Sequence, residues 1–179
     1  ASSAVSQKLI NENPPDKDHF MIHLIAMGDN ETYGWNRNGD GWPKEANQKF
    51  HNTFVKEGHF FREHDNRDPA KRIGDTVASA HNGEMARIEL IVHGHKKNAA
   101  EEYELAKEGK PLSFSMSARV PWDRCSCCGN KATKSANYCP HLKRNMNKWV
   151  PEFEKFAFAY NDLPTFFDIS RVKNPADRI

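Results

Sequence analysis

Apolar and polar residues alternate along several segments of this chain, and a period of two is typical of a strand with one buried face. In residues 19–27, every second position from Phe20 to Ala26 is apolar. Residues 84–92 repeat this pattern, and together with residues 72–80 they are predicted to form a hairpin. Further strands are predicted at residues 59–61, 112–120 and 163–172.

Two segments are predicted to be helical instead. In residues 44–56 the apolar positions from Ala46 to Phe54 recur at fourfold spacing, which places them on one side of a helix. Residues 98–108 form the second predicted helix, because Asn98 is a good N-cap and acidic residues follow it in the first turn.

The pattern as a whole predicts an α+β fold with a β-rich single domain over residues 19–179. Residues 1–18 are polar, contain two consecutive prolines and are predicted to be a loose N-terminal arm. The 179 residues are enough for one domain with a sizeable core.

Composition narrows the function classes. The formal net charge of +2 is too close to balance to indicate a polyanion partner, so no nucleic-acid partner is expected. Apolar stretches are far shorter than the roughly 20 residues that span a bilayer, and no membrane partner is expected either. Residues 1–8 lack the apolar core of a secretory signal, so no signal peptide is expected. The clustered cysteines favour reduced, intracellular assembly.

Cysteines are concentrated in residues 124–145, a segment that interrupts the strand pattern and is predicted to be an inserted knob. Closely spaced cysteines suit a metal better than a set of disulfides. Two short-spaced pairs provide the four ligands of a structural zinc ion. The predicted ligands are Cys125, Cys128, Cys139 and His141, with Cys127 spare or interchangeable with Cys125. A reduced, metal-free cluster is the alternative.

Three separated stretches carry the residue types of a nucleophilic serine site: His64-Asp65, a strand with three serines, and Asp168-Ile169-Ser170. A serine hydroxyl is inert at neutral pH without a neighbouring base, and that base needs a partner that holds its tautomer. Alone, each stretch is typical of a surface turn or an exposed strand. Ser113, Ser115 and Ser117 share one strand face, so spacing alone leaves the choice among them open.

The order of these stretches resembles that of the tailed-phage prohead maturation proteases, which are related in fold to the herpesvirus assemblins. The resemblance is carried by residues 61–65 (Phe-Arg-Glu-His-Asp) followed by Ile73-Gly74, by residues 112–117 after a helix that ends in Gly109, and by residues 167–176, which end in Pro-Ala. It implies that Ser115 is the nucleophile, that His64 is the general base and that Asp168 is the third member. It also implies an assemblin-like barrel with flanking helices.

This resemblance implies a serine endopeptidase that cleaves scaffold and capsid-precursor proteins during head assembly. Its partners would be those proteins and copies of itself, and its location the prohead interior or virion, with the host cytoplasm during assembly. The alternative is a catalytically inactive, structural virion protein on the same fold with a structural zinc site. A nucleic-acid-binding zinc protein is a third hypothesis, because basic residues such as Lys131 and Lys143 flank the cysteines. It has little weight, because a basic surface around a zinc knob is common without a nucleic-acid partner.

Overall fold

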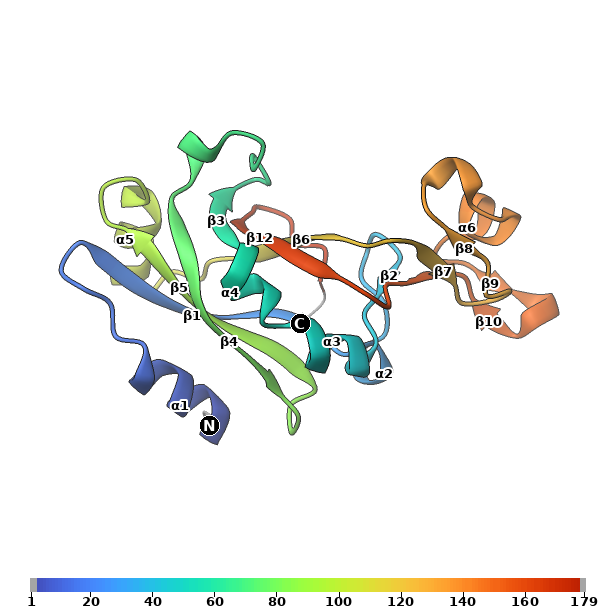
Figure 1. Ribbon diagram of the computed structural model, residues 1–179, viewed down its shortest axis with the longest axis horizontal. Helices are drawn as coiled ribbons and strands as arrows, with labels where there is room; N and C mark the ends of the chain where they lie inside the picture. Colours follow the sequence, from blue (N-terminus) through green and yellow to red (C-terminus); the bar gives the residue numbers. More distant parts are fainter. Residues whose placement is uncertain (1–2, 178–179) are drawn as a thin grey trace.

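A curled six-stranded sheet forms the body of the molecule (Figure 1). The computed structural model describes residues 3–177. The strand order is β1-β5-β4-β3-β12-β6, with β3 parallel to β12 and the other neighbours antiparallel. The strands are β1 (His19–Gly28), β3 (His59–Arg62), β4 (Gly74–Asn82), β5 (Arg87–His95), β6 (Phe114–Arg119) and β12 (Thr165–Arg171). The fold is mixed α+β and β-rich, as the alternating pattern predicts.

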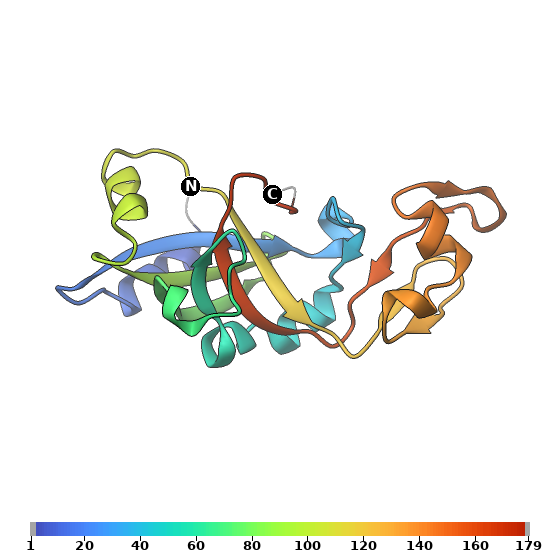
Figure 2. The same cartoon turned by 90° about the horizontal axis from the view of Figure 1, so that it is seen from above.

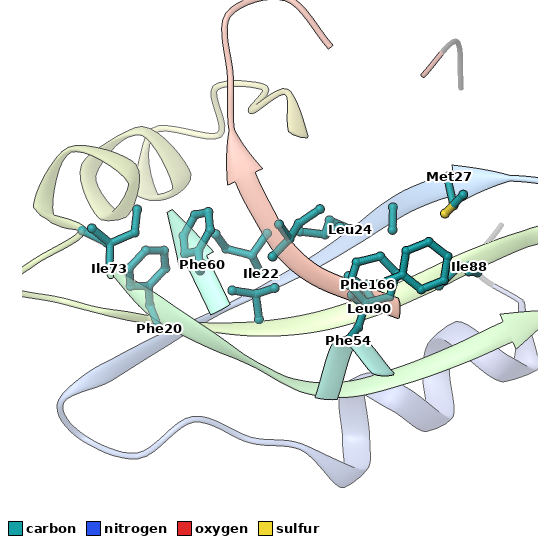
Figure 3. Close-up of a cluster of buried hydrophobic side chains, with 14 of the residues drawn as sticks. Phe20, Ile22, Leu24, Met27, Phe54, Phe60, Ile73, Ile88, Leu90 and Phe166 are labelled. Atoms are coloured by element: carbon teal, nitrogen blue, oxygen red, sulfur yellow. The ribbon is translucent and has the colours of Figure 1, made fainter. Parts of the chain in front are cut away.

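The concave side of this sheet holds the hydrophobic core. In β1 the burial alternates along the strand, and Phe20, Ile22 and Leu24 point into the core, as expected for a period of two. Figure 3 shows these side chains beside aromatic rings from other strands and from helix α4 (Thr53–Glu57). Phe54 stacks on Phe166 with ring centroids 4.4 Å apart, and both rings are fully buried.

The cysteine-rich segment projects from one end of the body (Figure 1). A four-stranded sheet of order β2-β11-β7-β8 connects it to the body. Its strands are β2 (Asp40–Gly41), β11 (Ala159–Tyr160), β7 (Asp123–Cys125) and β8 (Lys131–Ala132). The projection also contains η2 (Ser135–Asn137), α6 (Pro140–Asn145), η3 (Pro151–Phe153) and the hairpin of β9 (Trp149–Val150) with β10 (Lys155–Phe156).

This knob is longer than the predicted insert of residues 124–145. The small core of the knob contains Cys125, Leu142 and Ala159. The segment after residue 145, through β10, therefore still belongs to the knob, and the chain returns to the body only after it. The sequence pattern missed this because strands as short as β9 and β10 carry no detectable alternation.

The N-terminal arm differs from the prediction. Residues 1–2 lie outside the described residues, and α1 (Ala4–Glu12) is a helix rather than loose chain. Ser3 caps it, Leu9 is buried, and the Ser6 hydroxyl donates a 2.6 Å hydrogen bond to Glu89 of β5. These contacts with distant residues stabilise a helix whose own sequence pattern is weak.

The remaining helices follow the predictions approximately. The segment predicted as one helix over residues 44–56 is divided into α3 (Lys44–Phe50) and α4, with a turn between them. The second predicted helix is α5 (Ala100–Lys107), whose N-cap is Ala99 rather than Asn98. The short elements α2 (Asn30–Tyr33) and η1 (Pro69–Lys71) lie in loops, and no helix of residues 3–177 is long and apolar enough to cross a membrane.

Candidate functional site

Strand β12 lies between β3 and β6, and this arrangement brings the three candidate stretches together (Figure 2). In the strand register Asp168 lies opposite Ser117, and Ser170 lies opposite Ser115. Because successive side chains of a strand alternate between its faces, these four share the face away from the core. Ile169 and Met116, on the opposite face, contact the hydrophobic core.

His64 reaches this face from the turn that follows β3. Both Glu63 and His64 have left-handed backbone conformations, with φ angles of 47° and 56°. Each such residue costs on the order of 1 kcal/mol or more, and strain of this kind is concentrated at functional sites. Two hydrogen bonds to β12 hold the turn: Glu63 N–H donates to the Arg171 carbonyl at 2.9 Å, and His64 N–H donates to Ser170 Oγ at 3.3 Å.

The carboxylate of Asp168 is fully buried and accepts four hydrogen bonds. Three donors meet at Oδ2: His64 Nδ1 at 2.6 Å, Ser117 Oγ at 2.9 Å and Asn66 Nδ2 at 3.2 Å. Ser170 Oγ donates to Oδ1 at 2.8 Å. With donors on both of its oxygens, this carboxyl group acts as the acceptor toward the imidazole, and Nδ1 acts as the donor. It therefore fixes the proton of the imidazole on Nδ1.

This tautomer leaves Nε2 of His64 with a lone pair. Among residues 3–177, Nε2 accepts no hydrogen bond, and the side chain is 35% exposed. Imidazole in this state is the form that accepts a proton in general base catalysis. The candidate site thus holds an imidazole that is oriented through Nδ1 and open at Nε2.

The serine in contact with the imidazole is Ser117 rather than Ser115. Ser117 Oγ lies 3.1 Å from His64 Nδ1, the nitrogen that Asp168 already engages. Ser115 is buried two positions earlier, about 7 Å along the strand, and its hydroxyl has no hydrogen bond to His64 in the part of the chain described. The structure brings His64 and Asp168 together, and it places Ser115 beside them on the same face without contact to the base.

Two further residues of this site were given no role from the sequence, although Ser170 belongs to one of the three candidate stretches. Ser170 follows Asp168 by two positions on one strand, so the period of two already places both on one face. Asn66 lies in the turn after His64, and no spacing rule indicates that its amide reaches Asp168.

The second candidate site is the cysteine cluster in the knob. Ligand atoms of Cys125, Cys128, Cys139 and His141 all lie within 4.8 Å of one another, and no disulfide joins the cysteines. Cys128 Sγ is 3.6 Å from Cys139 Sγ, which is 3.7 Å from His141 Nδ1. A tetrahedral ion with Zn–S bonds of about 2.3 Å separates its ligand atoms by about 3.8 Å. The four predicted residues therefore lie close enough together to bind one metal ion.

The backbone geometry of the cysteine turn is suited to a metal at this position. Gly129 adopts a left-handed φ of 73°, and its N–H donates to the Cys125 carbonyl in the turn that brings Cys128 back toward Cys125. Cys127, the spare cysteine, is outside the four-residue cluster.

Comparison with known proteins does not assign either site. No family model matches the chain, and no curated protein or solved structure matches it significantly.

Proposed function

We propose that this chain is a serine endopeptidase in which His64 is the general base and Asp168 orients it. The observation that carries the proposal is the 2.6 Å bond from His64 Nδ1 to a fully buried carboxylate, beside a strand of serines. The carboxylate stabilises the imidazolium that forms when Nε2 takes a proton. Burying the aspartate and straining the turn of its histidine partner both cost folding free energy, which a purely structural role does not require.

Ser115 is the proposed nucleophile. The Ser117 hydroxyl donates a hydrogen bond to Asp168. It lies on the Nδ1 side of the His64 ring, where the nitrogen is protonated and cannot accept the serine proton. Ser115 lies on the same strand face and is the serine that the prohead-protease motif order indicates. His64 Nε2 takes the Ser115 proton as the hydroxyl attacks a peptide carbonyl, and then passes it to the leaving amine. Ser117 positions the aspartate in this scheme.

The substrates are proposed from the motif order along the chain. They are scaffold and capsid-precursor segments, cleaved inside an assembling phage head, where the protease also contacts copies of itself. The curled sheet, with His64, Ser115 and Asp168 on three neighbouring elements, is compatible with an assemblin-like barrel.

Zinc is the ion proposed for the knob. Three thiolates and one imidazole form a closed tetrahedral set, which is typical of structural zinc and leaves no position for a substrate. The ion would hold together a knob whose own core contains few apolar residues. Its role is therefore to stabilise the knob.

A fluorophosphonate probe tests the peptidase directly, because it labels only a serine whose neighbouring base is functional. Wild-type protein and Ser113→Ala, which removes a serine from the same face, are expected to be labelled. Ser115→Ala and His64→Ala are expected to lose labelling. Circular dichroism of each variant checks that the fold is retained.

A non-catalytic structural protein is the second candidate, and one observation favours it: the Ser115 hydroxyl has no hydrogen bond to His64 within the described residues. If wild-type protein is not labelled and does not cleave a co-expressed scaffold, the peptidase proposal is wrong and the structural role replaces it.

A further inference from the structure

A cavity of about 280 Å³ lies next to the candidate nucleophile. Ser115, Met116, Ser117 and Ala118 all line it. Their side chains alternate between the two faces of the sheet, so a single cavity touches all four only if it lies along the edge of β6. This strand is at the end of the six-stranded sheet, with β12 on its other side. The cavity is therefore placed beside the strand edge along which an extended peptide can pair.

The charges that line this cavity have one sign. Asp40, Asp123 and Asp177 contribute carboxyl groups, and no lysine or arginine is among the described lining residues. Amides line it as well, those of Asn36, Asn38 and Asn161. Burial raises the pKa of Asp40, and the charge of Asp123 raises it further. Asp40 and Asp123 repel each other, and a bound cation would relieve this repulsion.

An unpaired acceptor in the same cavity is independent of these acids. Asn161 is 2% exposed, and its Nδ2 donates to Asp40 Oδ1 at 3.2 Å. Its Oδ1 accepts no hydrogen bond from any of residues 3–177, although nearly all buried polar atoms in proteins have a partner. The indole N–H of Trp42, also buried and also lining the cavity, has no acceptor in the described part of the chain. The cavity thus holds a buried acceptor and a buried donor that a ligand can satisfy.

We propose that this cavity is a substrate subsite that binds the basic side chain of a lysine or arginine close to the scissile bond. An ammonium or guanidinium group compensates the charge of Asp40 and Asp123 and donates to Asn161 Oδ1. The Trp42 N–H donates to a carbonyl of the same peptide. This inference rests on the proposed peptidase function, because Ser115 both lines the cavity and is the proposed nucleophile.

Direct binding tests the subsite without catalysis. Short Ala-rich fluorescent peptides that differ only in one central residue, Lys, Gln or Glu, are titrated into the His64→Ala protein and followed by anisotropy. The Lys peptide is expected to bind about 10- to 100-fold more tightly than the Gln peptide, and the Glu peptide weakest. Equal binding of the Lys and Gln peptides, or a preference for Glu, would overturn the proposal.

Variants locate the preference in this cavity. Asp123→Asn, made in the same His64→Ala protein, keeps an acceptor for the Tyr138 hydroxyl and is expected to reduce the Lys preference about tenfold. Glu152→Gln changes the net charge equally on an exposed knob residue outside the cavity and is expected to leave the preference unchanged. Asp40→Asn and Asp177→Asn are the other cavity variants. A preference that survives all three aspartate changes places the basic side chain elsewhere and contradicts the proposal.

The two proposals fail separately. If wild-type protein cleaves no peptide and takes no fluorophosphonate, but the His64→Ala protein still prefers the Lys peptide, the peptidase is wrong and the basic-residue site stands. If wild type cleaves Lys, Gln and Glu peptides equally well, the subsite is wrong and the peptidase stands.

Discussion

Changing Asp168 to asparagine separates the orientation of His64 from the stability of the fold. Three of the four donors meet at Oδ2, so the amide oxygen of an asparagine is expected to take that position. The amide NH₂ then faces Ser170 Oγ, which at present donates to Oδ1 at 2.8 Å. A serine hydroxyl can accept as well as donate, and this bond can reverse.

The expected cost in stability is therefore modest and the loss in activity large. Exchanging charge-assisted hydrogen bonds for neutral ones in this buried position costs about 1–3 kcal/mol. For a domain of this size that is a fall in Tm of about 3–10 °C. The amide cannot stabilise the imidazolium, and kcat/KM is expected to fall about 10²- to 10⁴-fold, the upper figure being that of a triad whose acid is amidated.

Asp65→Asn is the matched control, because Asp65 is in the same turn, is half-exposed and pairs with Lys71 rather than with the imidazole. Thermal unfolding and fluorophosphonate labelling rates are measured for both variants. The reasoning is refuted if Asp168→Asn is labelled at the wild-type rate while folded, or if Asp65→Asn loses labelling to the same extent.

Three other perturbations have defined outcomes. Burial alone would raise the pKa of Glu89, but hydrogen bonds from Ser6, Asn82, His23 and Arg87 outweigh it and lower that pKa from 4.5 to about 2. The folded form thus gains stability that is complete above pH 4.5 and lost toward pH 2, about 3 kcal/mol in all, and urea unfolding of Glu89→Gln should lack this acid dependence. Cys139→Ser should lower the zinc content found by elemental analysis, whereas Cys127→Ser should not. Arg62→Ala leaves the buried carboxylate of Glu102 without its closest partner. Because Arg62 is partly exposed and Arg171 stays near Glu102, a loss of about 1–3 kcal/mol is expected in urea unfolding; wild-type stability would contradict that ion pair.

Much of the sheet could be predicted because its strands have one buried and one polar face. The alternation from Phe20 to Ala26 matches β1, and the serine strand and the final strand are both present with ends shifted by up to two residues. The hairpin strands β4 and β5 begin and end two or three residues later than predicted, because the sequence marks a turn more clearly than the pairing that sets its position.

The contact partner of His64 could not be predicted in the same way. Alternation shows that Ser113, Ser115 and Ser117 share a face, but the pairing register decides which one lies opposite Asp168. That register shifts between Phe166 and Asp168, where an irregularity interrupts the β12–β6 pairing. A register is set by contacts across the whole sheet, which the residues of one strand do not encode.

The residues of the metal cluster, in contrast to the contact partner of His64, could be predicted from their local spacing. Cys125 and Cys128 are three residues apart, and Cys139 and His141 are two residues apart, so local chain geometry brings each pair together. Only the meeting of the two pairs needs the fold, and the short β7–β8 pairing and α6 provide it.

Mapping of the phosphonylated residue by peptide mass spectrometry shows directly whether Ser115 is the nucleophile. The 179-residue protein is treated with a fluorophosphonate and digested, and the mass increment is assigned to one residue. We expect a single adduct on Ser115 that is absent when His64 is alanine. An adduct on Ser117 or on a serine outside β6, or a protein that takes no adduct at all, would contradict this assignment.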